Sequence, residues 1–324
     1  MKTLCVLCLF CALCVSCEYK DLCYDHNHVV PLQVIFDWTK APEAQVKGMT
    51  VQYYNMNNLA ADPVRYDYPG MDGGTARLGE ATWQALAYNY DTETILYRDM
   101  QSPATLEAYT RQSSIEEGTQ LSRSGMPRAV EAADEPVILE PDPLWAAVSD
   151  DIVLELGKTH EPVVMQPTRR VHELTVHIVN VPNLEYAGQF GAAVSGLAPS
   201  VKMATGELGE GCATQSFPLS VVGDTLTATV HIFGHCPHLK EGQVNPHLLT
   251  VYAILADGSK WYHTVDISDE VHNTGAPDPG PAPEDDGDIV VDLDGLPVPK
   301  PIVNGSGFRP TIDGWQGVEI DVSM

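Results

Sequence analysis

The sequence predicts an all-β protein in which two tandem antiparallel β-sandwiches follow an export signal. Three observations indicate this fold class. Apolar and polar residues alternate in short runs, Gly, Asp and Pro form turns between the runs, and long helical patterns are missing. The 324 residues include 26 Gly and 24 Pro, and 44% of them are hydrophobic, which is enough to build two cores.

The first residues have the pattern of a lipoprotein signal peptide. A short apolar run follows Lys2, and it is too short to span a bilayer. Ser16 is the small residue expected before a cleavage site, and the chain becomes polar directly after Cys17. We therefore predict removal of residues 1–16 and attachment of several acyl chains, such as palmitate, to Cys17, because a single chain binds a membrane only marginally. Ordinary secretion with cleavage near Ser16 or Cys17 is the alternative.

The N-terminal sandwich is expected over residues 29–148, behind a polar, lipidated tether at residues 17–28. Its first strand is expected from Val30 to Trp38, where every second residue is apolar. Short strands and turns then follow at the spacing of a sandwich. The strands are expected at 49–54, 83–89 and 94–97, the turns at 66–70 and 72–74, and either a helix or a strand at 103–111.

The C-terminal sandwich is expected over residues 149–324, where the alternation is clearer. The strands are expected at 174–179, 225–232, 249–255 and 261–267, with a hairpin turn at Asp257-Gly258. Residues 275–288 form a Pro- and acid-rich linker that cannot fold alone. Val318, Ile320 and Val322 alternate near the end of the chain and predict a terminal strand, which is either tucked into its own sheet or available to a partner.

Two cysteines of the expected C-terminal sandwich, Cys212 and Cys236, are candidates for a disulfide because an exported protein matures under oxidising conditions. Buried free thiols at these two positions are the alternative.

The charge of the chain limits its partners. The formal net charge is −26, so we exclude a protein that binds nucleic acid through its phosphates, which requires a basic face. The same charge argues against direct binding to an anionic membrane surface. A well-solvated acidic surface is the simplest interpretation.

No cofactor, metal site or catalytic site is expected. The densest group of metal-ligand residue types lacks the two properly spaced pairs or the rigid frame that structural zinc sites need. Its members are His231, His235, Cys236, His238 and His247. The acidic run at residues 284–288 lacks a full calcium-loop pattern and is interpreted as solvated linker. The chain contains no G-x-S-x-G, phosphate-loop or dinucleotide motif, and we expect no enzymatic activity.

Tryptophan side chains can stack on sugars, so glycan binding needs to be considered. Trp38 and Trp261 share strand faces with apolar residues, which favours packing in the core. An exposed pair of coplanar tryptophans would instead favour a glycan-binding surface.

Several motifs, taken in order, resemble the FimB-like fimbrial anchor and accessory lipoproteins of Bacteroidales. The resemblance spans nearly the whole chain behind the signal. The motifs are CEYKDLCYDH at 17–26, VIFDW at 34–38, GEATW at 79–83, YNYDTE at 88–93, PDPLW at 141–145, LDGLPVP at 293–299, GF at 307–308 and DGWQGVEI at 313–320.

This resemblance implies transthyretin-like sandwiches without enzymatic activity. It also implies an outer-membrane lipoprotein, lipid-anchored at the cell surface, that holds the base of a pilus or acts as an accessory subunit. Fimbrial subunits of this type join by β-strand exchange, and the family residue that matches here is the lipidated Cys17. Our leading hypothesis is a fimbrial anchor or accessory subunit. The alternatives are a surface lipoprotein that binds glycans for uptake and a lipoprotein with only a structural role.

Overall fold

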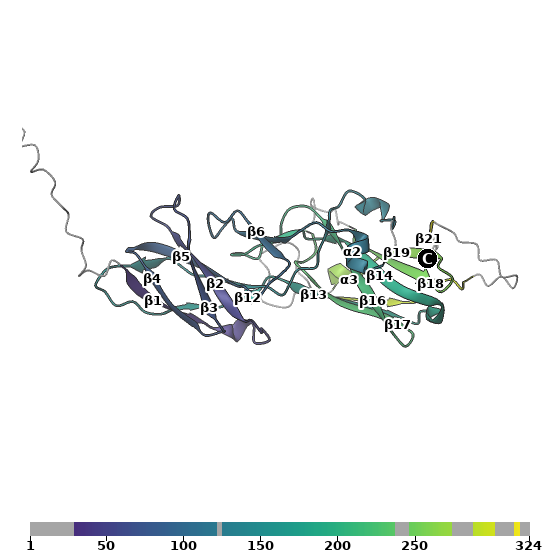
Figure 1. The fold of residues 1–324 in the computed structure, drawn as a ribbon, viewed down its shortest axis with the longest axis horizontal. Helices are drawn as coiled ribbons and strands as arrows, with labels where there is room; N and C mark the ends of the chain where they lie inside the picture. Colours follow the sequence, from purple (N-terminus) through teal and green to yellow (C-terminus); the bar gives the residue numbers. More distant parts are fainter. Residues whose placement is uncertain (1–28, 122–124, 237–245, 274–287, 302–313, 318–324) are drawn as a thin grey trace, which may run out of the picture.

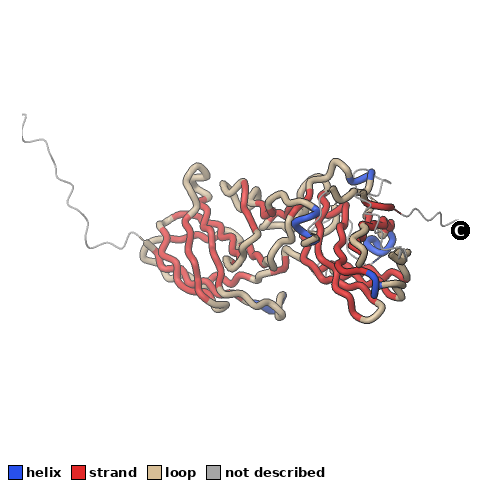
Figure 2. Tube along the Cα trace, turned by 45° about the vertical axis from the view of Figure 1, so that its right-hand side comes forward, coloured by secondary structure: helices blue, strands red, loops and turns tan. Residues whose placement is uncertain are grey.

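The computed structural model describes residues 29–121, 125–236, 246–273, 288–301 and 314–317. The regular secondary structure of the described chain is almost entirely β-strand, and the chain forms two lobes that follow one another along the long axis of the molecule (Figure 1). Helices are confined to short turns at the margins of the sheets (Figure 2). The predicted all-β fold is therefore confirmed. Within the described residues, no helix is both long and apolar enough to cross a membrane.

The N-terminal lobe contains two sheets that enclose one core. One sheet has the strand order β11-β1-β4, and the other has the order β12-β9-β5-β2-β3, with β10 also paired to β5. Its strands are β1 (Val30–Phe36), β2 (Gly48–Asn55), β3 (Val64–Pro69), β4 (Gly73–Leu78), β5 (Ala81–Asn89), β9 (Trp145–Val148), β10 (Ile152–Leu154), β11 (Val163–Met165) and β12 (Thr168–Arg169), with the 3-10 turn η1 at Trp38–Lys40.

The C-terminal lobe is built on a larger sheet that folds over on itself. Its strand order is β20-β13-β17-β16-β14-β18-β19-β21, and β8 also pairs with β16. Because β16 pairs with β14 along most of its length and with β17 at its end, the sheet forms two layers around one core. Its strands are β8 (Val137–Ile138), β13 (His172–Val179), β14 (Ala187–Leu197), β16 (Ala213–Val222), β17 (Thr225–Ile232), β18 (Leu248–Leu255), β19 (Lys260–Asp266), β20 (Ile289–Asp294) and β21 (Trp315–Gly317). Its short helical elements are α2 (Ile115–Thr119), α3 (Ser268–Asn273), η2 (Val130–Ala132) and η3 (Leu184–Tyr186).

A small third sheet joins the two lobes. Its order is β15-β7-β6, with β6 at Ile95–Arg98, β7 at Glu107–Thr110 and β15 at Ser200–Lys202. The segment that the sequence left open between helix and strand is thus β7. A separate hydrophobic cluster surrounds this sheet and combines side chains from both halves of the chain, among them Leu86 and Phe233. The lobes therefore share a packed junction and are not connected by a bare linker.

The N-terminal sheets extend past the boundary expected after residue 148. Strand β10 pairs with β5, β11 pairs with β1, and β12 pairs with β9. These three strands are short, between two and three residues each, so their alternation gives no signal in the sequence. We propose that the domain boundary lies after Arg169.

The turn expected at residues 66–70 is wrong, because most of this segment is strand β3. Tyr68 is buried, and its hydroxyl lies 2.9 Å from the hydroxyl of Tyr53 on the neighbouring strand β2. The turn expected at residues 72–74 is shorter than predicted, since β4 already begins at Gly73. Gly73 has φ +103, and a Cβ there would meet the Val34 carbonyl, so only glycine fits where β4 approaches β1.

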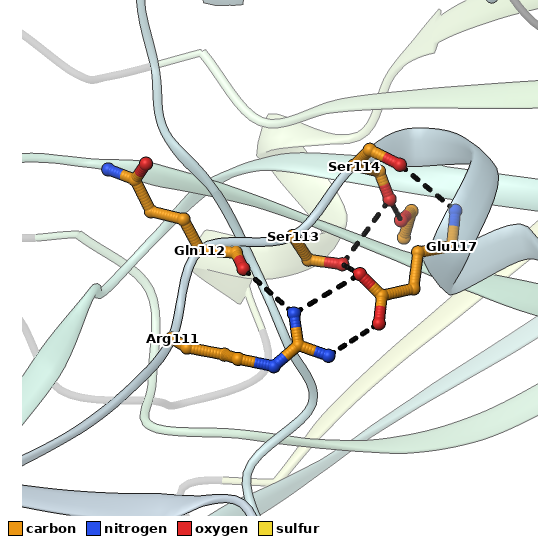
Figure 3. A network of polar contacts seen from close by, with 6 residues as sticks. Arg111, Gln112, Ser113, Ser114 and Glu117 are labelled. Carbon is orange, nitrogen blue, oxygen red and sulfur yellow. Dashed lines mark hydrogen bonds and ion pairs between the residues drawn. The ribbon is translucent and has the colours of Figure 1, made fainter.

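The helix α2 fastens the connection between the lobes to the C-terminal sheet. Ser114 caps its start by accepting a hydrogen bond from the Glu117 N–H at 3.1 Å. Arg111 donates two hydrogen bonds to the Glu117 carboxylate, and Ser113 donates a third at 3.0 Å (Figure 3). On the opposite side, Ser216 of β16 donates to the Ser114 carbonyl. This network holds the helix against β16 and β14.

Candidate functional site

Among the described residues, the C-terminal sheet ends in two edges that have no further partner strand, and residues from both line one groove. At one end, β20 pairs with β13 and with no further strand among the described residues. At the other end, β21 pairs in parallel with β19 but covers only its first half, Lys260–Tyr262. The rest of the outer edge of β19 has no partner strand in the described part of the chain. Open edges of this kind can accept a strand from another protein.

The hydrogen bonds between β19 and β18 show which main-chain groups of β19 face outward. The Ile267 N–H donates to the His247 carbonyl at 2.8 Å, and the Leu255 N–H donates to the Ser259 carbonyl at 2.9 Å. Between these two bonds, the register of β18 against β19 has no shift. In an antiparallel pair, alternate residues bond to the neighbour, so the main chains of Thr264 and Asp266 face away from β18. They present donors and acceptors at the open edge.

A groove of about 1070 Å³ runs along this edge. The second half of β19 forms its floor, from Tyr262 to Asp266, and the residues that end β20, Leu293–Pro297, form one wall. Val265 and Leu293 are partly buried and pack against the lobe core, whereas Leu296 is buried. The groove therefore offers apolar sites beside a row of main-chain hydrogen-bonding groups. An added β-strand requires both features.

The turn η2 forms the other wall of the groove. The Arg128 guanidinium shapes this wall by donating to the carbonyls of Ala132 and Glu135, each at 2.6 Å. The Tyr252 hydroxyl holds it in place by donating to the Pro127 carbonyl at 2.8 Å, and burial raises the pKa of Tyr252, so this donor stays protonated. Val130 at the rim is 86% exposed, a large apolar side chain facing solvent beside the groove.

The residues predicted to carry function lie partly outside the described part of the chain. Cys17 lies there, as do Val318, Ile320 and Val322. The last three directly follow β21, which already lies on the edge of β19. The order of strands in the sheet creates the groove, and this order cannot be predicted from the alternation of side chains along each strand.

The structure joins Cys212 and Cys236 by a disulfide with a Cα–Cα distance of 5.2 Å. The bond connects the segment before β16 to the segment after β17, next to the hydrogen bond from the Cys236 N–H to the Gly196 carbonyl. It fixes the end of the lobe that faces the junction between the lobes.

The tryptophans do not form an exposed pair. Trp83 and Trp261 are buried, and the other three tryptophans are half-buried. Trp38 and Trp145 pack against the N-terminal core, and Trp315 packs against a small cluster around Tyr252. The exposed pair of coplanar tryptophans that would favour glycan binding is therefore not found in this structure.

The acidic run also contains a structural residue. Asp288 accepts hydrogen bonds from both terminal nitrogens of Arg169, at 3.0 and 2.9 Å, and from the Glu173 N–H at 2.7 Å. Burial opposes ionisation, but the hydrogen bonds from Arg169 and Glu173 hold the pKa of Asp288 below its ordinary value. Asp288 is thus engaged at the start of β20 and is not solvated linker.

Two lobes of mainly antiparallel sheet, the second with a groove along an open edge, define a tandem β-sandwich protein. A family model described as a domain of unknown function (DUF5119) matches residues 16–218. Since this match spans more than half of the chain, the chain belongs to the DUF5119 family.

The chain is also similar to individual proteins. A relative from Bacteroides ovatus, described as "Putative fimbrium anchoring subunit Fim4B", is 24% identical over 332 residues, which cover 95% of this chain and 93% of the relative. A crystal structure of a "putative adhesin" from Bacteroides ovatus superposes with a TM-score of 0.56 at 19% identity, covering 84% of this chain and 94% of that one. The fimbrial anchor protein Mfa2 from Porphyromonas gingivalis superposes with a TM-score of 0.47 at 12% identity, covering 82% of this chain and 90% of that one.

These matches confirm the resemblance to fimbrial anchor proteins of Bacteroidales that the motifs predict. The adhesin structure shows the same fold.

Proposed function

We propose that this protein is a cell-surface subunit of a fimbrium, an anchor or accessory subunit, and that it joins its neighbour by pairing β-strands. The observation that carries the proposal is the open edge of β19, which lies in a groove with apolar sites. The similarity to a relative named as a fimbrium anchoring subunit supports the choice of partner. The absence of an exposed tryptophan pair leaves the glycan-binding alternative without a structural observation in its favour.

The neighbour's strand would lie along Thr264–Asp266. Their outward N–H and C=O groups would supply the main-chain hydrogen bonds, and alternate side chains of the incoming strand would enter the groove beside Val265 and Leu293. We further propose that the terminal residues Val318, Ile320 and Val322 form the segment that this chain contributes to the exchange. These residues directly follow Gly317, the last residue of β21, in the sequence.

The variant Thr264→Pro tests the acceptor edge. Proline removes the outward N–H and places its ring where the new strand would pair, while the main-chain hydrogen bonds of β19 to β18 stay intact. The side-chain hydrogen bond between the Thr264 and Thr250 hydroxyls is lost. We expect incorporation into fibres to fall about tenfold, which corresponds to about 1.4 kcal/mol. The measurement is the fraction of the variant that is recovered in purified fibres or co-purifies with fimbrial subunits from surface fractions.

The matched control is Arg65→Pro on the outer edge of β3 in the N-terminal lobe. The Gly70 N–H donates to the Lys47 carbonyl, so every second residue counted back from Gly70 along β3 bonds to β2. Arg65 is one of the residues in between, and its main-chain N–H and C=O therefore face away from β2. The control should fold and should enter fibres as the wild type does. Equal incorporation of the two variants, both folded by circular dichroism, would refute pairing at β19.

The lipid anchor is a separate proposal with its own test. We expect Cys17→Ala to move the protein from the membrane fraction to the soluble fraction, because the chain would lose its acyl chains. Metabolic labelling with a palmitate analogue should mark the wild type and not the variant. A variant that stays in the membrane fraction would show that another part of the chain holds it there.

A further inference from the structure

Three histidines from distant parts of the chain meet inside the C-terminal lobe. His235 follows β17, His247 precedes β18, and His272 lies in α3. Their ring centroids are 5.5 Å apart for His235 and His247, 5.4 Å for His235 and His272, and 4.9 Å for His247 and His272. One ring nitrogen of each lies within 4.8 Å of the other two. The spacing of histidines in the sequence predicts no metal site, and the densest group of ligand residues in the sequence does not include His272.

The cluster is withdrawn from solvent. His247 has no exposed surface, His235 is 6% exposed, and His272 is half-buried. Neither ring nitrogen of His247 has a hydrogen-bond partner among the described residues. A buried polar atom without a partner costs about 1–3 kcal/mol, and native proteins rarely leave one unused. A ligand bound by the ring would remove that cost.

The main chain holds His247 and His235 in place. The His247 N–H donates to the Ser268 hydroxyl at 2.9 Å, and that hydroxyl donates to the Asp266 carboxylate at 2.6 Å. His235 forms an isolated β-bridge with Leu197 and precedes Cys236, which is held by the disulfide. Bonds of this kind fix the positions of the rings before a ligand arrives, which is how proteins preorganise a metal site.

The ring of His247 is packed against a glycine. Gly196 has φ +76, and a Cβ at this position would lie 2.6 Å from Nδ1 of His247. Only glycine therefore leaves room for the ring in its present position. The Gly196 N–H is held by the carboxylate of Glu135 at 3.2 Å, so the main chain here is also fixed.

The orientation of His235 also suits metal binding. Nδ1 of His235 lies 3.3 Å from the Cys236 carbonyl. In the tautomer whose Nδ1–H donates to this carbonyl, Nε2 presents its lone pair, and metal-ligating histidines are commonly oriented in this way.

We propose that His235, His247 and His272 form a binding site for a zinc-class transition-metal dication, with Zn²⁺ as the expected ion. Three imidazoles suit Zn²⁺ and disfavour Mg²⁺ and Ca²⁺, which prefer oxygen. Zn–N bonds of about 2.0–2.1 Å at tetrahedral angles put the nitrogens about 3.4 Å apart, so the rings need to close by up to about 1.4 Å from the 4.8 Å limit. A water molecule would complete the shell. The ion would fasten α3 to the connection between β17 and β18.

The test uses the full mature chain with its disulfide intact, stripped of metal by a chelator that is then dialysed away. Isothermal titration with Zn²⁺ should give one tight site per chain. A hundredfold excess of Zn²⁺ over Kd should raise Tm by about 5 °C or more. Mg²⁺ at the same concentration should leave Tm unchanged.

The informative variant is His272→Gln, since His272 is the least buried of the three and its replacement disturbs the core least. We expect its Zn²⁺ affinity to fall at least tenfold and the rise in Tm to disappear. The matched control, His177→Gln, replaces an exposed histidine of β13 and should bind as the wild type does. Loss of tight binding in His272→Gln alone supports the site. Absence of Zn²⁺ binding by the wild type, or equal binding by the two variants, overturns it.

Discussion

Two of the motifs that carry the family resemblance meet at the side chain of Asn89. Its Oδ1 accepts a hydrogen bond from the Trp145 N–H at 2.9 Å, and its Nδ2 donates to the Pro143 carbonyl at 3.1 Å and to Asp91 at 2.9 Å. Asn89 is almost fully buried, so these bonds are made away from water. The YNYDTE and PDPLW motifs therefore hydrogen-bond to each other and form one structural unit.

Asp142 of the second motif completes this unit. Its carboxylate accepts from the Thr94 N–H at 2.6 Å and from the Thr94 hydroxyl at 2.9 Å. In return, the Thr94 hydroxyl accepts from the Asp142 N–H at 2.9 Å. The turn between β5 and β6 is thereby tied to the chain that leads into β9. The sequence shows both motifs, but it does not show that they touch, because 48 residues separate Thr94 from Asp142.

At the residue scale, we expect Asn89→Ala to lower the free energy of unfolding by about 2–4 kcal/mol. The truncation leaves the Trp145 N–H and the Pro143 carbonyl buried without their partner. Chemical unfolding followed by tryptophan fluorescence measures the change. Asn58→Ala, at an exposed position before β3, is the control and should stay within about 0.5 kcal/mol of the wild type. A similar small change in Asn89→Ala would show that the motif contact contributes little.

At the element scale, His231 ties β17 to the segment that precedes β9. One Glu140 carboxylate oxygen lies 2.9 Å from both the main-chain nitrogen and Nδ1 of His231. The hydrogen bond from Glu140 raises the pKa of His231, against a smaller opposing effect of burial. The folded state therefore holds this proton more tightly than the unfolded state does. The stabilisation is fully present below the unfolded pKa of about 6.5 and is lost as the pH rises through the folded pKa.

We therefore expect His231→Gln to destabilise the protein more at pH 5.5 than at pH 9. The difference should be below about 1 kcal/mol, because both side chains are partly exposed to water. Urea unfolding of the variant and the wild type at the two pH values measures it. The control His177→Gln should change the free energy of unfolding by the same amount at both pH values. A larger destabilisation by His231→Gln at pH 9 than at pH 5.5 would contradict a raised pKa of His231 in the folded state.

Strands with one buried and one exposed face could be predicted from the sequence, and strands with two buried faces could not. In β1 and β13, buried and exposed residues alternate, and both strands overlap the expected ranges. The expected end of the first strand at Trp38 is wrong, because β1 ends at Phe36 and Trp38 begins the 3-10 turn η1. In β14 the last eight residues are all buried, because α2 and the lobe core cover its two faces, and its Gly, Ala and Ser residues show no alternation. The groove was not predictable, because it depends on which strands end the sheet. The histidine cluster could not be predicted either, since 25 residues separate His247 from His272 and no metal-ligand motif or strand periodicity relates the two positions.

At the scale of the whole molecule, the two lobes act as one elongated body (Figure 1). The third sheet and its hydrophobic cluster pack between them, and the bidentate Arg169–Asp288 pair joins β12 to the start of β20. This junction suits a subunit that carries tension between a membrane and a fibre. In the arrangement that we propose, load enters at Cys17, crosses the packed junction and leaves through the strand that pairs with β19.

Hydrogen–deuterium exchange of the β19 amides tests the strand-pairing claim most directly. The protein would be compared alone and in its complex with fimbrial subunits isolated from surface fractions. We expect the amides of Thr264 and Asp266 to be protected in the complex at least tenfold, because a strand that pairs with them would engage their outward N–H groups. The amide of Arg65 on the edge of β3 should exchange at the same rate in both states. Unchanged exchange at Thr264 and Asp266 in a verified complex would contradict the claim that the subunits join at this edge.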